Sequence, residues 1–95
     1  MDTIEITIPS HPKYLKVVRC GVERLCQLSP LTKEGVAGVI QAVNEAVTNI
    51  IRHAYENAPD KPISLRCRLL PDALEIVLHD SGKSTDPENL RSREL

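Results

Sequence analysis

The sequence contains no tryptophan and no phenylalanine, and Tyr14 and Tyr55 are its only tyrosines. Proteins that bind single-stranded nucleic acid stack the bases on aromatic side chains, and this chain has little material for such a surface. Its formal net charge of −1 gives no basic field that would attract a phosphate backbone. We therefore expect no direct nucleic-acid partner.

Long apolar runs are also missing. No stretch approaches the ~20 apolar residues that a membrane-spanning helix needs. The N-terminal residues Met1–Glu5 include acidic side chains where a signal peptide has basic ones, and no apolar stretch follows them. The sequence therefore predicts a cytoplasmic protein without membrane contact.

Cysteine is scarce. Cys20, Cys26 and Cys67 are an odd number, and none lies in a Cys-x-x-Cys spacing. This pattern argues against both a metal site and a disulfide framework. Each cysteine has apolar neighbours, so we expect all three to be small buried side chains in a reducing compartment.

The first elements follow from the spacing of apolar residues. Ile4, Ile6 and Ile8 alternate with polar residues, which predicts a strand with one buried face that ends at Pro9. Ser10 is placed to cap a following helix that runs to about residue 28.

A second, longer helix is predicted from Thr32, as its N-cap, to about Tyr55. Its apolar residues fall in one stripe at ~100° per residue, which is typical of an amphipathic helix that faces a core. The residues of this stripe are Val36, Val39, Ile40, Val43, Val47, Ile50, Ile51 and Ala54.

The second half of the sequence predicts an antiparallel hairpin. Residues 63–70 and 74–80 each alternate apolar and polar side chains, and Pro71 is typical of the tight turn between them. Asp86 and Pro87 indicate the start of a short helix that runs to the chain end. The resulting order predicts a single α+β domain over residues 1–95, a two-layer sandwich of helices on a mixed or antiparallel sheet.

A polar stripe runs along the long helix through Glu45, Asn49 and His53, which are spaced by four residues. A solvated helix face is one interpretation. The other is a ligand site, because a carboxylate and an amide oxygen one turn apart are hard ligands that suit Mg²⁺. Thr48 and Asn49 are also poor helix formers for a surface that is only solvated. The spacing alone leaves both interpretations open.

The string Glu45–Tyr55 (Glu-Ala-Val-Thr-Asn-Ile-Ile-Arg-His-Ala-Tyr) resembles the N-box of the GHKL superfamily of histidine-kinase-like ATP-binding domains. Within that superfamily it is most similar to the anti-sigma-factor serine kinases. Residues 76–82 (Ile-Val-Leu-His-Asp-Ser-Gly) resemble the G1 box, a strand that runs into Asp-x-Gly, and Asp86-Pro87 follow as in many of these kinases. His53 and Tyr55 match the motif, and we expect structural roles for them.

The resemblance implies a role for each matching residue. Asn49 would hold the Mg²⁺ that bridges the ATP phosphates, and Glu45 would orient or deprotonate the serine hydroxyl of a partner protein. Asp80 would accept a hydrogen bond from the adenine amino group, and Gly82 would let the backbone pass close to the base. Taken singly, Asp80 could be a turn-capping residue and Gly82 a residue that needs positive φ.

The sequence also departs from the family. In the family the chain continues beyond the position of Leu95 with the ATP lid, a glycine-rich G2 box and the final strands. This sequence contains no Gly-x-Gly, and Lys83-Ser84 stand where many superfamily members have a further glycine. We therefore expect a partial domain that has the metal and adenine residues, lacks the phosphate-covering loop and is inactive as a kinase at this length.

The resemblance implies that the intact protein binds ATP and Mg²⁺, phosphorylates an anti-anti-sigma partner and sequesters a sigma factor. The alternative is a non-catalytic protein-interaction module of the same fold in a bacterial partner-switching pathway. Kinases of this type also tend to be dimers. Because the missing C-terminal strand would flank residues 74–80, we expect Ile76 and Leu78 to lie at an open sheet edge that supports a homodimer.

Overall fold

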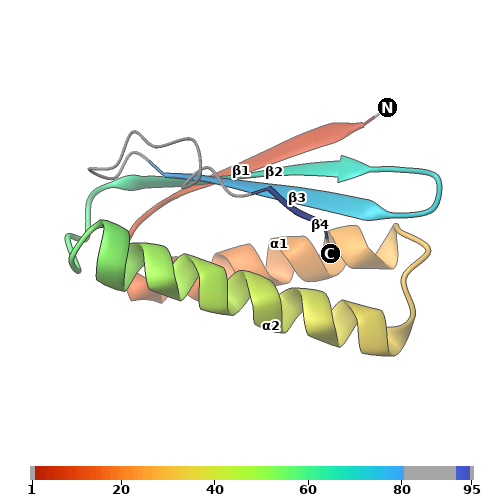
Figure 1. Cartoon of the computed structure of the whole chain (residues 1–95), viewed down its shortest axis with the longest axis horizontal. Helices are drawn as coiled ribbons and strands as arrows, with labels where there is room; N and C mark the ends of the chain where they lie inside the picture. Colours follow the sequence, from red (N-terminus) through yellow and green to blue (C-terminus); the bar gives the residue numbers. More distant parts are fainter. Residues whose placement is uncertain (1, 81–91, 95) are drawn as a thin grey trace.

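The computed structural model describes residues 2–80 and 92–94, which form two layers, an antiparallel sheet and a pair of helices that covers one of its faces (Figure 1). The elements in chain order are β1 (Thr3–Pro9), the 3₁₀ turn η1 (Pro12–Tyr14), α1 (Leu15–Gln27), α2 (Lys33–Asn49), the π-helix η2 (Ile50–Ala54), β2 (Pro62–Leu69), β3 (Leu74–Asp80) and β4 (Ser92–Glu94). The predicted α+β two-layer sandwich is confirmed.

The sheet has the strand order β1-β2-β3-β4, and each described pair of neighbours is antiparallel. The predicted hairpin is confirmed, since Leu69 pairs with Leu74 and the Leu70 N–H donates to the Ala73 carbonyl oxygen at 2.9 Å. Alternate residues of β2 and β3 face the helices and are buried, among them Ile63, Leu65 and Ile76. The apolar alternation in the sequence therefore places the sheet's buried face.

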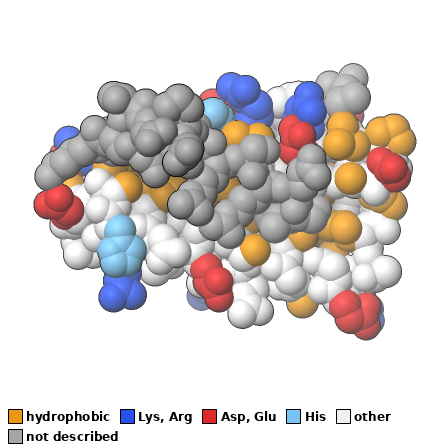
Figure 2. Space-filling view, in the orientation of Figure 1, with side chains coloured by type: hydrophobic (Ala, Val, Ile, Leu, Met, Phe, Trp, Pro, Cys, Tyr) orange, Lys and Arg blue, Asp and Glu red, His pale blue; other side chains and the backbone are white. Residues whose placement is uncertain are grey.

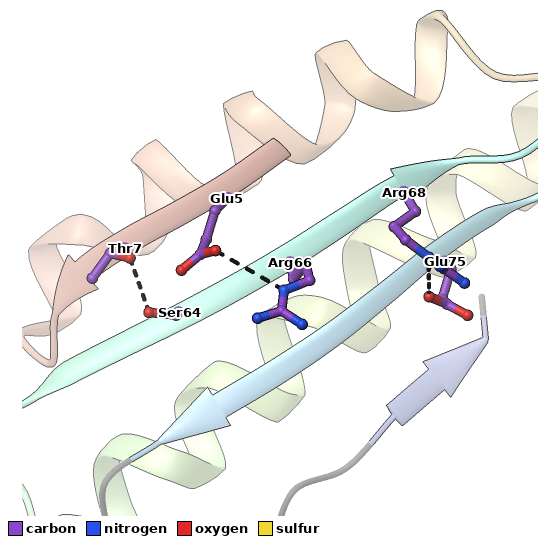
Figure 3. Close-up of polar contacts among 6 residues, drawn as sticks. All are labelled: Glu5, Thr7, Ser64, Arg66, Arg68 and Glu75. Atoms are coloured by element: carbon purple, nitrogen blue, oxygen red, sulfur yellow. Dashed lines mark hydrogen bonds and ion pairs between the residues drawn. The ribbon is translucent and has the colours of Figure 1, made fainter. Parts of the chain in front are cut away.

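The other face of the sheet is polar, and its side chains pair across the strands (Figure 3). Thr7 Oγ1 lies 2.9 Å from Ser64 Oγ, and the Arg68 guanidinium donates to Glu75 at 2.7 Å. The Glu5 carboxylate lies 4.0 Å from the Arg66 guanidinium. These pairs are partly exposed, so each stabilises the fold by only a fraction of a kcal/mol, about 0.2–1.

The two helices pack on the sheet through the stripes that their sequences predict. Thr32 caps α2 as expected, because its hydroxyl accepts from the Gly35 N–H at 3.1 Å. Buried side chains of α1, of α2 and of η2 with the residue that follows it join those of the strands in one core, namely Val18, Val22, Leu25, Cys26, Val39, Val43, Ala46, Val47, Ile51 and Tyr55. No helix within residues 2–80 is long and apolar enough to cross a membrane.

Ser10 does not cap a helix. His11 takes that position, since its Nδ1 accepts from the Lys13 N–H at 3.1 Å. Ser10 is instead fully buried at the end of β1 and bonds to the loop that precedes β2. The sequence pattern predicted a hydrogen bond from Ser10 to a nearby backbone group. Its actual partners, Ala58 and Lys61, lie about fifty positions away in the sequence.

Two further expectations are wrong. Cys20 is exposed on α1, and only Cys26 and Cys67 are buried. The edge of β3 is not fully open, because β4 pairs with it through Val77↔Ser92, Ile76↔Arg93 and Glu75↔Glu94. The same strand shows that the helix expected from Asp86 does not reach the chain end, while Asp86 itself lies outside the described residues.

On the face shown in Figure 2, basic and acidic side chains are interspersed, and hydrophobic atoms gather toward the right-hand end. The C-terminal end of α1 and the turn between β2 and β3 lie at that end (Figure 1). The three large hydrophobic residues that are most exposed in the described ranges are Ile4, Val17 and Leu28. None of them belongs to the polar stripe of α2.

Candidate functional site

Helix α2 presents Glu45 and Asn49 on its exposed side, one turn apart. Its opposite side is anchored by buried Val43 and Val47, which fixes the direction of the two polar side chains. The Gln41 side-chain amide donates to Glu45 Oε1 at 3.4 Å. Within the described ranges the Asn49 side chain has no hydrogen-bond partner, so its amide oxygen is available to a ligand.

The helix changes its hydrogen-bonding pattern directly after Asn49. Residues 50–54 form a π-helix, and the Tyr55 N–H donates to the Ile50 carbonyl oxygen, five residues back, at 2.9 Å. Single turns of π-helix inside α-helices occur frequently at functional sites. Asn49 therefore lies at a junction between two helix types, a feature that the apolar periodicity does not predict.

The end of η2 carries the two motif residues for which structural roles were expected. Tyr55 is 6% exposed, lies in the core and donates its hydroxyl hydrogen to the Pro62 carbonyl oxygen. A structural role for Tyr55 is therefore confirmed. His53 is exposed, so it continues the polar side of the helix rather than the core.

Asp80 is the last residue of β3 and is half-buried. It lies opposite Ile63, the fully buried second residue of β2. Gly82 lies outside the described residues. Of the two candidate site residues in the G1 box, Asp80 and Gly82, the structure describes only Asp80, at the end of a central strand.

The predicted residues come from both layers of the fold. Glu45 and Asn49 share adjacent turns of α2, whereas Asp80 belongs to the sheet. The C-terminal end of α2 and η2 and the end of β3 nevertheless lie at the same end of the molecule, at the left of Figure 1. The bond from Tyr55 to Pro62 connects them, because Pro62 adjoins the strand residue that faces Asp80.

Residues 2–80 contain no group of three or more His, Cys, Asp or Glu side chains that could hold a metal ion. Mg²⁺ does not require such a cage, since it keeps several waters and binds through one or two protein oxygens together with substrate phosphates. An exposed amide oxygen at Asn49, one turn from a carboxylate, fits that mode. The residues present therefore fit a magnesium ion delivered with a nucleotide.

The buried cysteines do not contribute to this site. Burial raises the pKa of the Cys67 thiol to about 11, with a smaller contribution from Cys26. Burial also raises the pKa of Cys26, and Glu23 adds to that shift. Both thiols therefore stay protonated at neutral pH and act as core side chains.

Comparison with known proteins gives relatives with a consistent name. The chain is 33% identical to the serine-protein kinase RsbW of Bacillus velezensis over 86 residues, which cover 90% of this chain and 54% of the relative. It is 31% identical to the serine-protein kinase RsbW of Bacillus subtilis over 85 residues, 90% of this chain and 53% of the relative. For the protein of that name in Staphylococcus aureus, identity is 32% over 93 residues, 97% of this chain and 58% of the relative.

The chain thus spans about half the length of the curated relatives it matches. The family described as the histidine kinase-like ATPase domain matches residues 8–95, which include all of the candidate site. The antiparallel sheet, the two covering helices and the order of the N-box and G1-box residues are in accord with that match. The chain belongs to the histidine kinase-like ATPase domain family.

Proposed function

We propose that this chain is the Mg-ATP-binding part of a cytoplasmic serine-protein kinase. Asn49 holds the magnesium ion, Glu45 orients or deprotonates the acceptor hydroxyl, and Asp80 and Gly82 recognise adenine. The observation that carries the proposal is the exposed pair Glu45 and Asn49, with an unengaged amide at Asn49, at the end of the fold where β3 presents Asp80. The serine-protein kinases to which the chain is similar support the reaction type.

In the proposed phosphoryl transfer, Asn49 and Glu45 have different roles. This reaction depends on positioning and on neutralising charge more than on covalent chemistry. When bound, Mg²⁺ supplies the charge neutralisation at the phosphates. The Asn49 amide holds the ion at the helix junction, and Glu45 lies one turn away, where a carboxylate can take the proton of an incoming hydroxyl.

The partners follow from the same proposal. The phosphorylated protein is an anti-anti-sigma protein that presents a serine, and a sigma factor is sequestered in the alternative complex. The non-catalytic interaction module remains the second candidate, and what favours it is the apolar side of the molecule along β1 and α1.

That side supports a homodimer through β1. β1 is one of the two edge strands of the described sheet, and the Asp2 carbonyl accepts from the Leu69 N–H at 3.2 Å. Because hydrogen-bonded pairs alternate along an antiparallel ladder, the backbone groups of residues 3, 5 and 7 point away from β2. Apolar surface is provided by Ile4 on β1, Val17 on α1 and Leu28 directly after α1, which are 39%, 55% and 60% exposed.

The segment Thr3–Thr7 also reads the same in both directions, Thr-Ile-Glu-Ile-Thr. Two copies that pair antiparallel about Glu5 would set threonine against threonine and isoleucine against isoleucine. Such self-complementarity is what a two-fold interface requires. A second copy of this chain therefore fits the β1 edge.

Calorimetric titration with Mg-ATP tests the proposed nucleotide site in the full gene product. We expect Asp80→Asn to reduce the binding heat strongly, because it replaces the carboxylate that accepts from the adenine amino group with a neutral amide, which is a weaker acceptor and carries donors of its own. Asp72→Asn, at the exposed hairpin turn, is the matched control and should bind as the wild type does. Equal heats for wild type and Asp80→Asn would refute the adenine assignment.

A further inference from the structure

Ser10 is the one residue with a small polar side chain that is fully buried in the described ranges, at 0% exposure. Its hydroxyl donates to the Ala58 carbonyl oxygen and accepts from the Lys61 N–H at 3.0 Å. Both partners belong to the loop between η2 and β2. The end of the first strand therefore holds a loop that follows the nucleotide-motif helix.

Tyr55 holds the same loop from its other side. Its hydroxyl donates to the Pro62 carbonyl oxygen, and its own carbonyl accepts from the Ala58 N–H at 2.8 Å. Between these bonds, Glu56 and Asn57 have φ values of 50° and 65°, a left-handed conformation in which non-glycine residues are uncommon. The hydroxyl bonds of Ser10 and Tyr55, together called the loop anchor, thus hold a loop whose backbone is otherwise unfavourable.

The loop anchor connects the two halves of the candidate site. Tyr55 of the loop anchor directly follows η2, and η2 continues α2 from Asn49 without a break. On the other side the loop anchor fixes Pro62, whose neighbour Ile63 lies opposite Asp80. The chain path from the metal residue to the strand that faces the adenine residue therefore runs through the anchored loop.

Loss of a buried partner is costly here. Without the Ser10 hydroxyl, the Ala58 carbonyl and the Lys61 N–H lose their shared partner, and a part-buried polar group left without a partner is disfavoured. The loop would then relax toward solvent, and the π-turn that it terminates would lose its fixed end.

We propose that Ser10 and Tyr55 are positioning residues that set the place of the Asn49 helix end relative to Asp80. The role rests on the proposed nucleotide function. It predicts that weakening the loop anchor disturbs the magnesium side of the site while β3 keeps the adenine side intact.

Ser10→Ala and Tyr55→Phe test the proposal, and Ser29→Ala is the matched control. Ser29 has the same bonding pattern away from the loop, since its hydroxyl donates to the Cys26 carbonyl at 2.6 Å and accepts from the Leu31 N–H at 3.3 Å. The first measurement is amide hydrogen exchange of this chain without nucleotide. We expect the amides of residues 55, 58 and 61 to exchange about tenfold faster in Ser10→Ala and within about twofold of wild type in Ser29→Ala.

The second measurement is ATP affinity of the full gene product with Mg²⁺ and with a chelator. In Ser10→Ala and Tyr55→Phe we expect the gain in affinity on adding Mg²⁺ to shrink about fivefold or more, and the affinity in chelator to stay within about twofold. A general loss of stability would lower both affinities together. Ser29→Ala should retain the wild-type gain.

Each outcome decides between the possibilities. Unchanged exchange of residues 55–61 in Ser10→Ala would overturn the loop anchor. Faster exchange with an unchanged effect of Mg²⁺ would overturn the positioning role. If the wild-type protein bound no nucleotide, the proposed function and the positioning role would both be wrong, and the exchange result would still decide whether the anchor holds the loop.

Discussion

A β-carbon added to Gly21 of α1 would lie 2.9 Å from Cδ1 of Ile6 in β1. At this point α1 contributes no side chain, and the Ile6 side chain of the edge strand β1 lies against the helix backbone. The atom in the way is the end of a flexible and half-buried side chain, so it can turn aside at small cost. At this position the gain in stability from replacing a helix glycine by alanine is therefore opposed by the displacement of the Ile6 side chain.

We expect Gly21→Ala to change stability by less than Gly38→Ala does. Replacing a helix-interior glycine by alanine stabilises by about 1 kcal/mol. At Gly38 nothing lies within 4 Å of the added carbon, so the full gain is expected. At Gly21 the displacement of Ile6 offsets part of it. Urea-unfolding midpoints of the two variants and wild type measure the difference, and a larger gain at Gly21 would contradict the close approach.

Glu45→Ala should separate binding from chemistry in the full gene product. We expect ATP affinity within a few-fold of wild type and phosphotransfer to the partner slowed by ~10²-fold or more, the usual size of a general-base effect. Glu23→Ala, an exposed carboxylate on α1, is the control. Single-turnover transfer from labelled ATP gives both rates, and an unchanged rate in Glu45→Ala would make Glu45 a surface residue.

Cysteine reactivity should follow burial. Cys20 is exposed, whereas Cys26 and Cys67 are buried with raised pKa values. We expect a thiol reagent at pH 8 to modify one cysteine rapidly and the other two only on unfolding. Peptide mapping identifies the modified residue. Rapid modification of Cys67 would contradict its position in the core.

The raised pKa of Cys67 also has a pH consequence. The folded thiol holds its proton up to about pH 11, while the unfolded thiol titrates near its usual value of 9.0. The stabilising contribution is thus fully present below pH 9 and is lost as the pH rises toward 11. Unfolding free energies at pH 8 and pH 10.5 should therefore fall less in Cys67→Val than in wild type. An equal fall in both would show that the thiol is not responsible.

The oligomeric state should depend on the backbone of residue 5. The Glu5 N–H points away from β2, so Glu5→Pro removes a donor from the outer edge and leaves the bonds to β2 in place. We expect wild type and Glu5→Ala to dimerise at micromolar concentration and Glu5→Pro to be monomeric, as measured by light scattering. Glu5→Ala also removes like charges that would face each other. A dimeric Glu5→Pro would exclude β1 as the contact.

The sequence predicts best the helices and strands whose pattern of apolar residues follows directly from which side chains are buried in the core. Alternation in β1, β2 and β3 and the apolar stripe of α2 each place a continuous row of side chains in the core, as Val47 and Ile63 illustrate. Spacing and resemblance also select Glu45 and Asn49 as candidate site residues, and the structure places both on the exposed side of α2. Asp80 was located at the end of its strand for the same reasons.

Other features could not be read from the sequence. The π-turn after Asn49 changes which carbonyl each N–H bonds to, and the pattern of apolar side chains does not encode that choice. Ser10 follows a strand and precedes a proline-containing turn, a context equally suited to a local cap and to a distant partner. Cys20 has apolar neighbours in sequence, but they face the core on the other side of α1.

The pairing of β1 with β2 joins segments separated by roughly fifty residues, whereas the β2–β3 turn closes over four. Closing the longer loop costs about 2 kcal/mol more in chain entropy, since that cost grows as (3/2)RT times the logarithm of loop length. The local hairpin and the helix pair should therefore form early, and β1 should add to the sheet late in folding. The hydroxyl of Ser10 reaches Ala58 and Lys61 only when that last strand is in place. The geometry around the nucleotide-motif helix would thus be completed by a segment that is synthesised before the helices and the hairpin but is the last to find its partners.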